Sequence, residues 1–132
     1  MIVLDASAVV EVLMATRVGA SVVRRVQADD ALPHSLSLVD LEVASALRRL
    51  VRLGALDARR GGEAIRDLLD FALVRFPPLP LLGRIWQLRE RMTPYDAAYV
   101  ALAEELGAPL LTVDGRLARA GGHRAKIEVV AS

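Results

Sequence analysis

Short apolar runs alternate with helix-like stretches along the whole chain, and this alternation limits the fold more than any other feature. Strands are expected within MIVLD, ALPHS, VRFPPLP, PLLTVD and KIEVV. The run with three prolines is expected at an edge, since proline cannot donate to a sheet ladder. Strands and helices that alternate through short connections form a parallel sheet with helices on both faces. The sequence therefore predicts an α/β fold, in a single domain over residues 1–132.

Capping residues mark the predicted helices of the first half. Ser7 is expected to cap a helix that reaches about Met14, and a second helix covers about residues 18–28. Ser37 is expected to cap a long amphipathic helix, with Asp40 completing a capping box. Gly54 ends this helix, because glycine readily adopts the left-handed conformation found after helix C-termini.

The second half contains one strong helix start. Thr93 can cap a helix, Pro94 suits its first position, and Asp96 can complete a capping box. Gly107 ends this helix. The other helices of this half are expected at residues 57–73, capped by Asp57, at 81–91, and within GRLARA.

Four acidic residues occupy positions that such a fold brings together. Asp5 and Asp114 each end an apolar run, and Glu42 and Asp96 lie near the starts of two helices. In a parallel sheet, strand C-ends and helix N-ends share the edge where ligands bind. Carboxylates crowded at one edge repel each other unless a cation neutralises them. The four acids therefore predict a hydrated Mg²⁺ or Mn²⁺ site, and such sites usually act on phosphates.

Helix capping is an alternative explanation for each acid alone. Asp5 and Asp114 can be helix caps, and Asp96 can be only the acidic member of a capping box. Glu42 can be a first-turn acid that the helix dipole stabilises by about 0.3–1 kcal/mol. Helix N-termini gather at this edge in any case, so both explanations remain open at this point. The two histidines, His34 and His123, lack metal-ligand spacing and are interpreted as structural or surface residues.

Composition excludes several classes of protein. The chain has no cysteine, and so no disulfide, thiol nucleophile or thiolate zinc site. Asp5 and Glu11 interrupt the N-terminal apolar run, which argues against a signal peptide, and no apolar stretch is long enough to span a bilayer. We therefore expect a soluble, cytoplasmic protein. No glycine-rich phosphate loop or nucleophile elbow is present, and a receiver-type phosphoacceptor domain would need a second acid beside Asp5.

The apolar residues and the basic residues each come mainly from a few residue types. Hydrophobic residues make up 54% of the chain but aromatic residues only 4%, and an excess of Ala, Val and Leu in a small domain favours a subunit or partner interface. Lys126 is the only lysine among 17 basic residues. Arginine suits bidentate phosphate contacts, although codon bias explains the same choice. Because the net charge is only +1, any basic surface must be local.

Three segments carry a resemblance to a known family. MIVLDASAVVEVL, LEVASALRRL and TPYDAAYVALAEELGAPLLTVDGRLARA resemble PIN-domain ribonucleases, specifically the VapC toxins of toxin–antitoxin pairs, and the similarity runs the length of the chain. The resemblance implies an endoribonuclease that depends on Mg²⁺ or Mn²⁺ and cleaves structured or messenger RNA. It also implies a cognate VapB-type antitoxin and a homodimer. The alternative is a catalytically inactive PIN-like module that binds RNA or protein.

The resemblance assigns roles to the individual residues. Asp5, Glu42, Asp96 and Asp114 match the four acids of the family in chain order, with Asp5 and Asp96 as the metal-binding pair. Ser7 and Thr112 match the hydroxyl positions that steady these acids. Arg116 is expected near the rim of the site, where it either contacts an RNA phosphate or is a solvated helix arginine. The early helices, at residues 7–14 and 37–53, are expected to form the antitoxin groove.

Overall fold

Five short parallel strands form the centre of the computed structural model, which describes residues 1–131. They are β1 (Val3–Leu4), β2 (His34–Leu36), β3 (Val74–Phe76), β4 (Leu110–Thr112) and β5 (Ile127–Val129). Their order in the sheet is β3-β2-β1-β4-β5, and every pair is parallel. The expected parallel sheet is confirmed, and the proline-containing run lies at one edge as β3.

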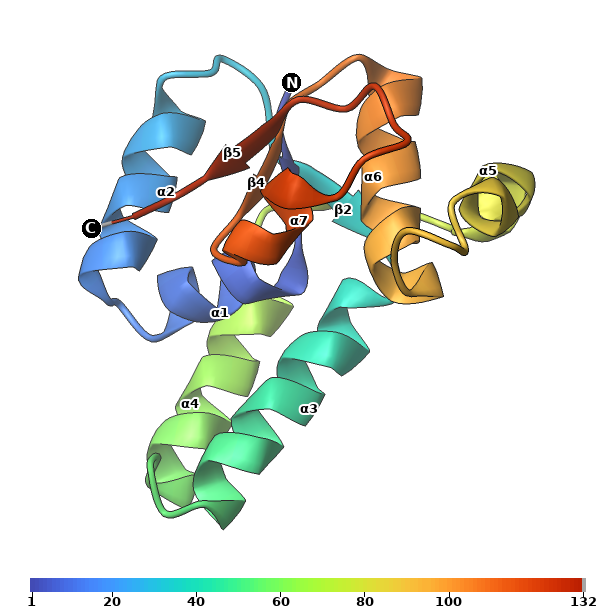
Figure 1. The fold of residues 1–132 in the computed structure, drawn as a ribbon. Helices are drawn as coiled ribbons and strands as arrows, with labels where there is room; N and C mark the ends of the chain where they lie inside the picture. The colour runs from blue at the N-terminus through green and yellow to red at the C-terminus, as the bar shows by residue number, and fades with distance from the viewer. Residues whose placement is uncertain (132) are drawn as a thin grey trace.

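Helices cover both faces of the sheet (Figure 1). They are α1 (Ala6–Leu13), α2 (Arg17–Gln27), α3 (Val39–Arg52), α4 (Ala58–Leu69), α5 (Leu82–Gln87), α6 (Pro94–Leu106) and α7 (Gly115–Arg119), with a 3₁₀ turn, η1 (Leu79–Leu81), before α5. Figure 1 also shows α3 and α4 running side by side away from the sheet. No single helix of residues 1–131 is long and apolar enough to cross a membrane; only the bent pair α1 and α2, at 109°, meets the length and composition criteria together.

Alternation along the strands divides the core in two. Val3 and Leu110 point to the layer of α5 and α6, whereas Leu4 and Leu111 point to the layer of α1 to α4. This follows from the two-residue period of a strand, which sends successive side chains to opposite faces. Burial of each such side chain stabilises the fold by about 1.5–3 kcal/mol. Both layers are therefore anchored on β1 and β4, the strands that carry the candidate site.

Several predicted helix ends are confirmed. Thr93 accepts a hydrogen bond from the Asp96 N–H at 3.2 Å, and Asp57 accepts one from the Arg59 N–H at 2.8 Å. Gly54 and Gly107 follow α3 and α6 with positive φ angles of 74° and 61°. At these four positions local capping chemistry was sufficient to place the helix boundary.

Two predicted caps are wrong. Asp5, not Ser7, caps α1, since its carboxylate accepts the Ala8 N–H at 3.0 Å. Ser37 does not cap α3, which has Leu38 at its N-cap position and no side-chain cap. Asp40 is not part of a capping box either: its carboxylate forms a bidentate ion pair with Arg75 of β3, at 2.8 and 2.9 Å. A charged pair of this kind is stronger than a neutral capping bond.

Two helices are shorter than predicted. The fourth ends at Leu69 rather than near residue 73, because Leu73 is buried in the core just ahead of β3. The fifth ends at Gln87 rather than residue 91, because the backbone continues in three-residue turns, such as the bond from the Arg91 N–H to the Leu88 carbonyl. These turns lead directly into the Thr93 cap of α6.

Candidate functional site

The four acids lie at the point where the strand order reverses. The chain leaves β1 toward β2 and β3 on one side and later returns to β4 and β5 on the other, and ligands bind beyond the strand C-ends at such a point. Asp5 follows β1 directly, and Asp114 comes two residues after β4. Glu42 and Asp96 lie in the first turns of α3 and α6. The negative charges of these acids raise one another's pKa values, for example that of Asp96 on Asp5 and that of Asp114 on Asp96.

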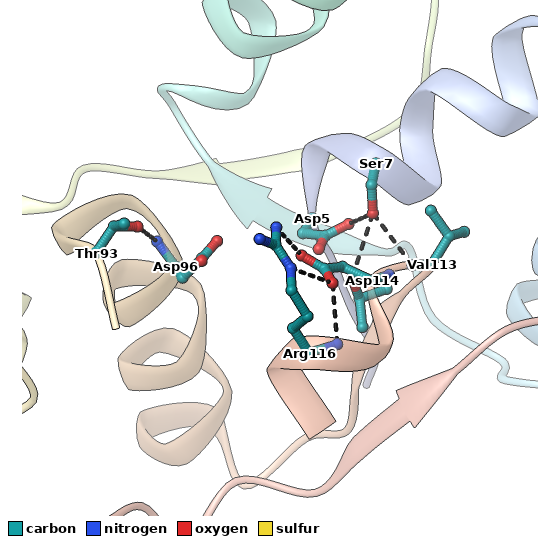
Figure 2. A network of polar contacts seen from close by, with 8 residues as sticks. Asp5, Ser7, Thr93, Asp96, Val113, Asp114 and Arg116 are labelled. Carbon is teal, nitrogen blue, oxygen red and sulfur yellow. Dashed lines mark hydrogen bonds and ion pairs between the residues drawn. The ribbon is translucent and has the colours of Figure 1, made fainter. Parts of the chain in front are cut away.

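A relay of hydroxyl groups holds Asp5 in place (Figure 2). The Ser7 hydroxyl donates to the Asp5 carboxylate at 2.6 Å, so its oxygen is left to accept from the Val113 N–H at 3.1 Å. Thr112 lies 3.3 Å from the Ser7 oxygen and accepts the Asp114 N–H at 3.1 Å. Since Ser7 has already donated its only proton, Thr112 must be the donor in the Ser7–Thr112 pair. The family-based expectation that Ser7 and Thr112 steady the acids therefore agrees with this geometry.

Burial makes the Asp5 charge unfavourable in the absence of a cation. The residue is 8% exposed, and this desolvation raises the pKa of its carboxyl group above the usual value. Hydrogen bonds from Ser7 and Ala8, together with the nearby Thr112 hydroxyl, lower the pKa in part, and the negative charge of Asp96 raises it again. Both contacts donated by Ser7 and Ala8 fall on the same oxygen, Oδ1, which leaves Oδ2 without either of these bonds.

Glu42 is held by a residue that the sequence reasoning missed. The Tyr99 hydroxyl donates to Glu42 Oε1 at 2.6 Å. Burial raises the pKa of Glu42 most, and the charges of Asp5 and Asp96 raise it further, against the opposing bond from Tyr99. Tyr99 itself is buried, and burial together with Glu42 raises its pKa, so it stays a proton donor. The available signal was spacing, since Tyr99 comes three residues after Asp96 and so lies on the same face of α6.

Asp96 directs its carboxylate toward the other acids rather than back to its own helix cap. The Thr93 hydroxyl accepts the Asp96 N–H, but the reciprocal bond of a capping box, to the Thr93 N–H, is absent from the hydrogen bonds of residues 1–131. Burial raises the pKa of Asp96, and the Asp114 charge adds to the effect, while Arg116 and Thr93 lower it. The predicted Thr93 cap is thus confirmed, but the predicted capping box is wrong, because the Asp96 carboxylate does not bond the Thr93 N–H and is available to the site.

Asp114 differs from the other three acids because it has a cation of its own. Arg116 Nη2 lies 2.9 Å from Asp114 Oδ2, and Asp114 also caps α7 by accepting the Arg116 N–H at 3.0 Å. This arginine is the main reason that the pKa of Asp114 is lowered. Figure 2 shows the Arg116 guanidinium on the side of Asp114 that faces Asp96. Arg116 therefore lies at the rim, as expected, but here it contacts an acid of the site.

The carboxylate oxygens of the acid site suit a hard divalent cation. Three coupled carboxylates with raised pKa values are an oxygen-rich, charge-crowded set, and Mg²⁺ prefers oxygen ligands. Their spacing is open, because no three His, Asp or Glu side chains within residues 1–131 converge closely enough to enclose an ion by themselves. Mg²⁺ keeps several of its waters and is often held by one or two carboxylates, so an open set fits it. Neither histidine takes part: His34 stacks on Phe76, and His123 accepts the Ala125 N–H.

Comparisons with known proteins identify the family. A model of the PIN domain matches residues 2–123. Ribonuclease VapC12 of Mycobacterium tuberculosis is 44% identical over 131 residues, which cover 99% of this chain and all of that protein. The chain belongs to the VapC ribonuclease family of PIN-domain proteins. Ribonuclease VapC9 of the same organism is also 44% identical, over 98% of both chains.

Solved structures agree with the VapC fold. PAE2754 from Pyrobaculum aerophilum superposes with a TM-score of 0.72 at 25% identity, covering 97% of this chain and 83% of that one. Mycobacterium tuberculosis VapC20, described as a sarcin–ricin loop cleaving toxin, superposes with a TM-score of 0.67 at 16% identity, covering 90% of this chain and 94% of that one. At that identity the second likeness supports the PIN fold alone.

Tyr99→Phe should weaken this VapC-type site without unfolding the chain. The variant removes the one hydrogen-bond donor to the Glu42 side chain within residues 1–131 and leaves a half-buried carboxylate without its hydrogen bond. A bond to a charged group contributes about 1.5–3 kcal/mol, so we expect a loss in the free energy of unfolding at the low end of that range. Loss of an outer-shell partner typically costs about 10–100-fold in metal affinity or activity.

Tyr95→Phe is the matched control for that prediction. Tyr95 is one turn earlier on the same helix and is exposed, so its hydroxyl faces water. The free energy of unfolding, measured in urea, and the rate of RNA cleavage should both be unchanged in Tyr95→Phe and lowered in Tyr99→Phe. Equal behaviour of the two variants would show that the Glu42 contact has no role in the site.

Proposed function

We propose that the chain is a metal-dependent endoribonuclease toxin of a type II toxin–antitoxin pair, which cleaves RNA phosphodiester bonds and thereby inhibits translation. Family membership supports the ribonuclease class. The observation that carries the metal dependence is the set of three coupled carboxylates, Asp5, Glu42 and Asp96, whose charges are destabilised by burial and by one another. Such a set needs a cation before the scissile phosphate can bind among these carboxylates.

In this proposal Asp5 and Asp96 would hold Mg²⁺ or Mn²⁺, and Glu42 and Asp114 would be direct or water-mediated ligands. When bound, the ion lowers the pKa of a coordinated water and neutralises charge on the phosphate. The Ser7–Thr112 relay fixes the orientation of Asp5, and Tyr99 fixes that of Glu42. Preorganised groups of this kind need no rearrangement as charge develops on the reacting phosphate.

Glu42 is the better candidate for the general base. Hydrolysis adds water across the P–O bond: the water oxygen bonds to phosphorus, a ribose oxygen leaves, and the attacking water loses a proton. A base is most effective when its pKa lies near the working pH. The pKa of Glu42 is raised, whereas Arg116 lowers that of Asp114, so Glu42 is the stronger proton acceptor of the two.

Two apolar surfaces support the proposed partners, a VapB-type antitoxin and a second copy of the chain. Leu41 and Leu69 are 77% and 80% exposed and flank a hollow of about 410 Å³ between α3 and α4. An amphipathic helix can bind in a groove of this kind. The other surface, on η1 and α5, includes Leu79 and Trp86, which is 67% exposed. Light scattering should give a dimer mass, and the product of the adjacent reading frame should co-purify on co-expression.

RNA cleavage by the purified chain tests the proposed function. Incubation of total RNA with Mg²⁺ or Mn²⁺ should release fragments, and sequencing of their ends would identify the cleaved site. The alternative, an inactive PIN-like module, predicts that RNA stays intact under the same conditions. Intact RNA with both ions, from a chain that melts cooperatively, would reject the ribonuclease in favour of that module.

The acid site should also leave a signature in the pH dependence of stability. A carboxyl group whose pKa is raised by folding binds more protons in the folded than in the unfolded state, so its contribution is favourable below its unfolded pKa, near 4, and is lost as pH rises through the higher folded value. Asp96 is such a group. Without divalent ions, Asp96→Asn should melt above the original chain at pH 7, and the difference should shrink toward pH 4.

Calorimetry at a series of pH values in EDTA measures this difference. Asp114→Asn is the control with the opposite sign, because the pKa of Asp114 is lowered and its loss should reduce the melting temperature at pH 7. A melting difference for Asp96→Asn that is constant with pH would contradict the assigned repulsion.

A further inference from the structure

A row of arginines continues from Glu42 along the outer part of α3. Figure 1 shows α3 extending away from the sheet, beside α4. Glu42 lies in its first turn, and Ser45, Arg49 and Arg52 follow at intervals of three or four residues, which places them on one face of the helix. Together with their neighbours, including Arg48, they line an open hollow of about 570 Å³. Glu42 therefore belongs both to the acid site and to the hollow that the arginines line.

These three arginines have no acidic partner, whereas seven of the other thirteen arginines form ion pairs within residues 1–131. Arg75 and Arg84, for example, each form close ion pairs with a carboxylate. Across residues 1–131, no ion pair involves Arg48, Arg49 or Arg52. Beyond Glu42, α3 contains no acidic residue at all. The positive charge on this face is thus not neutralised within the described chain.

Helix stability alone explains this arrangement poorly. The helix dipole favours cations in the last turn of α3, where both Arg49 and Arg52 lie, but it does not account for Arg48. Arg48 and Arg52, however, are four residues apart, and like charges at that spacing destabilise a helix. All three side chains are exposed, so they also contribute little to the core. Local choices that oppose stability are expected where a surface has a binding function.

We propose that the exposed face of α3 is a phosphate-binding track for the RNA strand next to the scissile bond. The proposal rests on the proposed ribonuclease function and extends it to the path of the substrate. At a rise of 1.5 Å per residue, Arg49 and Arg52 lie about 10 and 15 Å along the helix from Glu42. They therefore contact phosphates beside the cleaved one, and their role is binding rather than catalysis. Arginine suits this role because its planar fork can donate two hydrogen bonds to one phosphate.

A local track also agrees with the charge of the whole chain. With a net charge of only +1, the molecule has no general positive field to attract RNA. Affinity must then come from a few defined contacts. Each phosphate contact with a single strand releases counterions and contributes about 0.7 to the slope of log affinity against log salt. Removal of two arginines should therefore lower the slope by about 1.4.

The test compares two double variants with the same change in charge. Arg49→Ala/Arg52→Ala removes two charges from the track, and Arg59→Ala/Arg66→Ala removes two exposed charges from α4 in the same helical pair. Binding of a fluorescein-labelled single-stranded RNA is measured by anisotropy in EDTA, at several salt concentrations. The track variant should bind about 25-fold more weakly at 0.1 M salt, with the slope lowered by about 1.4. The α4 variant should keep most of the affinity, and both should melt near the temperature of the original chain.

Three outcomes would overturn the track. Affinity and slope unchanged in Arg49→Ala/Arg52→Ala would reject it directly. Equal losses in the two double variants would show that only net charge matters. Binding of polyglutamate without binding of RNA would assign the arginines to an acidic protein partner instead. Failure of the original chain to cleave RNA with Mn²⁺ is a separate result: it rejects the proposed nuclease, while the anisotropy data still decide whether RNA binds along α3.

Discussion

Asp96→Asn should reduce RNA cleavage by at least about 100-fold while the fold is retained. The substitution keeps the size of the side chain and the backbone N–H that Thr93 accepts, but it removes one of the two charges proposed to hold the metal. Loss of a single preorganised electrostatic contact to the reacting centre typically costs about 10²–10³ in kcat. Cleavage rates with Mn²⁺, measured at saturating RNA, give the effect.

Asp5→Asn should show the same loss for the same reason. Asparagine is as good a helix N-cap as aspartate, so its amide oxygen can still accept from Ala8 and Ser7. Asp67→Asn, an exposed acid on α4, is the charge-matched control and should cleave at the original rate. Full activity in either Asp5→Asn or Asp96→Asn, with a normal melting curve, would refute the assignment of the metal-binding pair.

Chelation should stop cleavage completely. Excess EDTA should lower the cleavage rate to that of RNA alone, and added Mg²⁺ or Mn²⁺ should restore it. Without the ion, the pKa of the attacking water stays too high for the proposed base to deprotonate it. The ion should also stabilise the fold, because it binds the native state and relieves repulsion among Asp5, Glu42 and Asp96. At 100 times its dissociation constant, the gain is about 2.7 kcal/mol.

A variant separates this specific effect from a general effect of salt. In Asp5→Asn/Asp96→Asn the rise in melting temperature on adding Mn²⁺ should be largely lost, whereas Asp67→Asn should keep it. Calorimetry with and without the ion measures both. Cleavage that persists in excess EDTA would instead indicate a metal-free ribonuclease mechanism.

Local signals were enough to predict the fold and the location of the four acids. Alternating apolar runs gave the parallel sheet, and Thr93, Pro94 and Gly107 gave the limits of α6, because each acts on its own backbone neighbours. Asp5 and Asp114 could be placed at the sheet edge because a parallel topology collects strand ends there. The two explanations offered for these acids are compatible, since both residues cap helices and also belong to the acid site.

Contacts between distant segments could not be read in the same way. The Tyr99–Glu42 hydrogen bond depends on how α6 meets α3, 57 residues earlier. The position of Asp40 in the sequence predicts a capping box. Its actual partner, Arg75, is 35 residues away on β3, and no local pattern indicates this ion pair. The position of Ser7 predicts a helix cap. Asp5, two residues earlier, supplies the cap instead, and Ser7 joins the hydroxyl relay.

The relay between Thr112, Ser7 and Asp5 joins residues more than 100 positions apart, and this has a consequence during synthesis. A ribosome makes Asp5 early, but β4, the strand whose Thr112 completes the relay, is made more than 100 residues later. A nascent or truncated chain that ends before residue 110 therefore lacks both the relay and Asp114. The acid site therefore cannot be complete on the ribosome until β4 and Asp114 have left the exit tunnel and β4 can pair with β1.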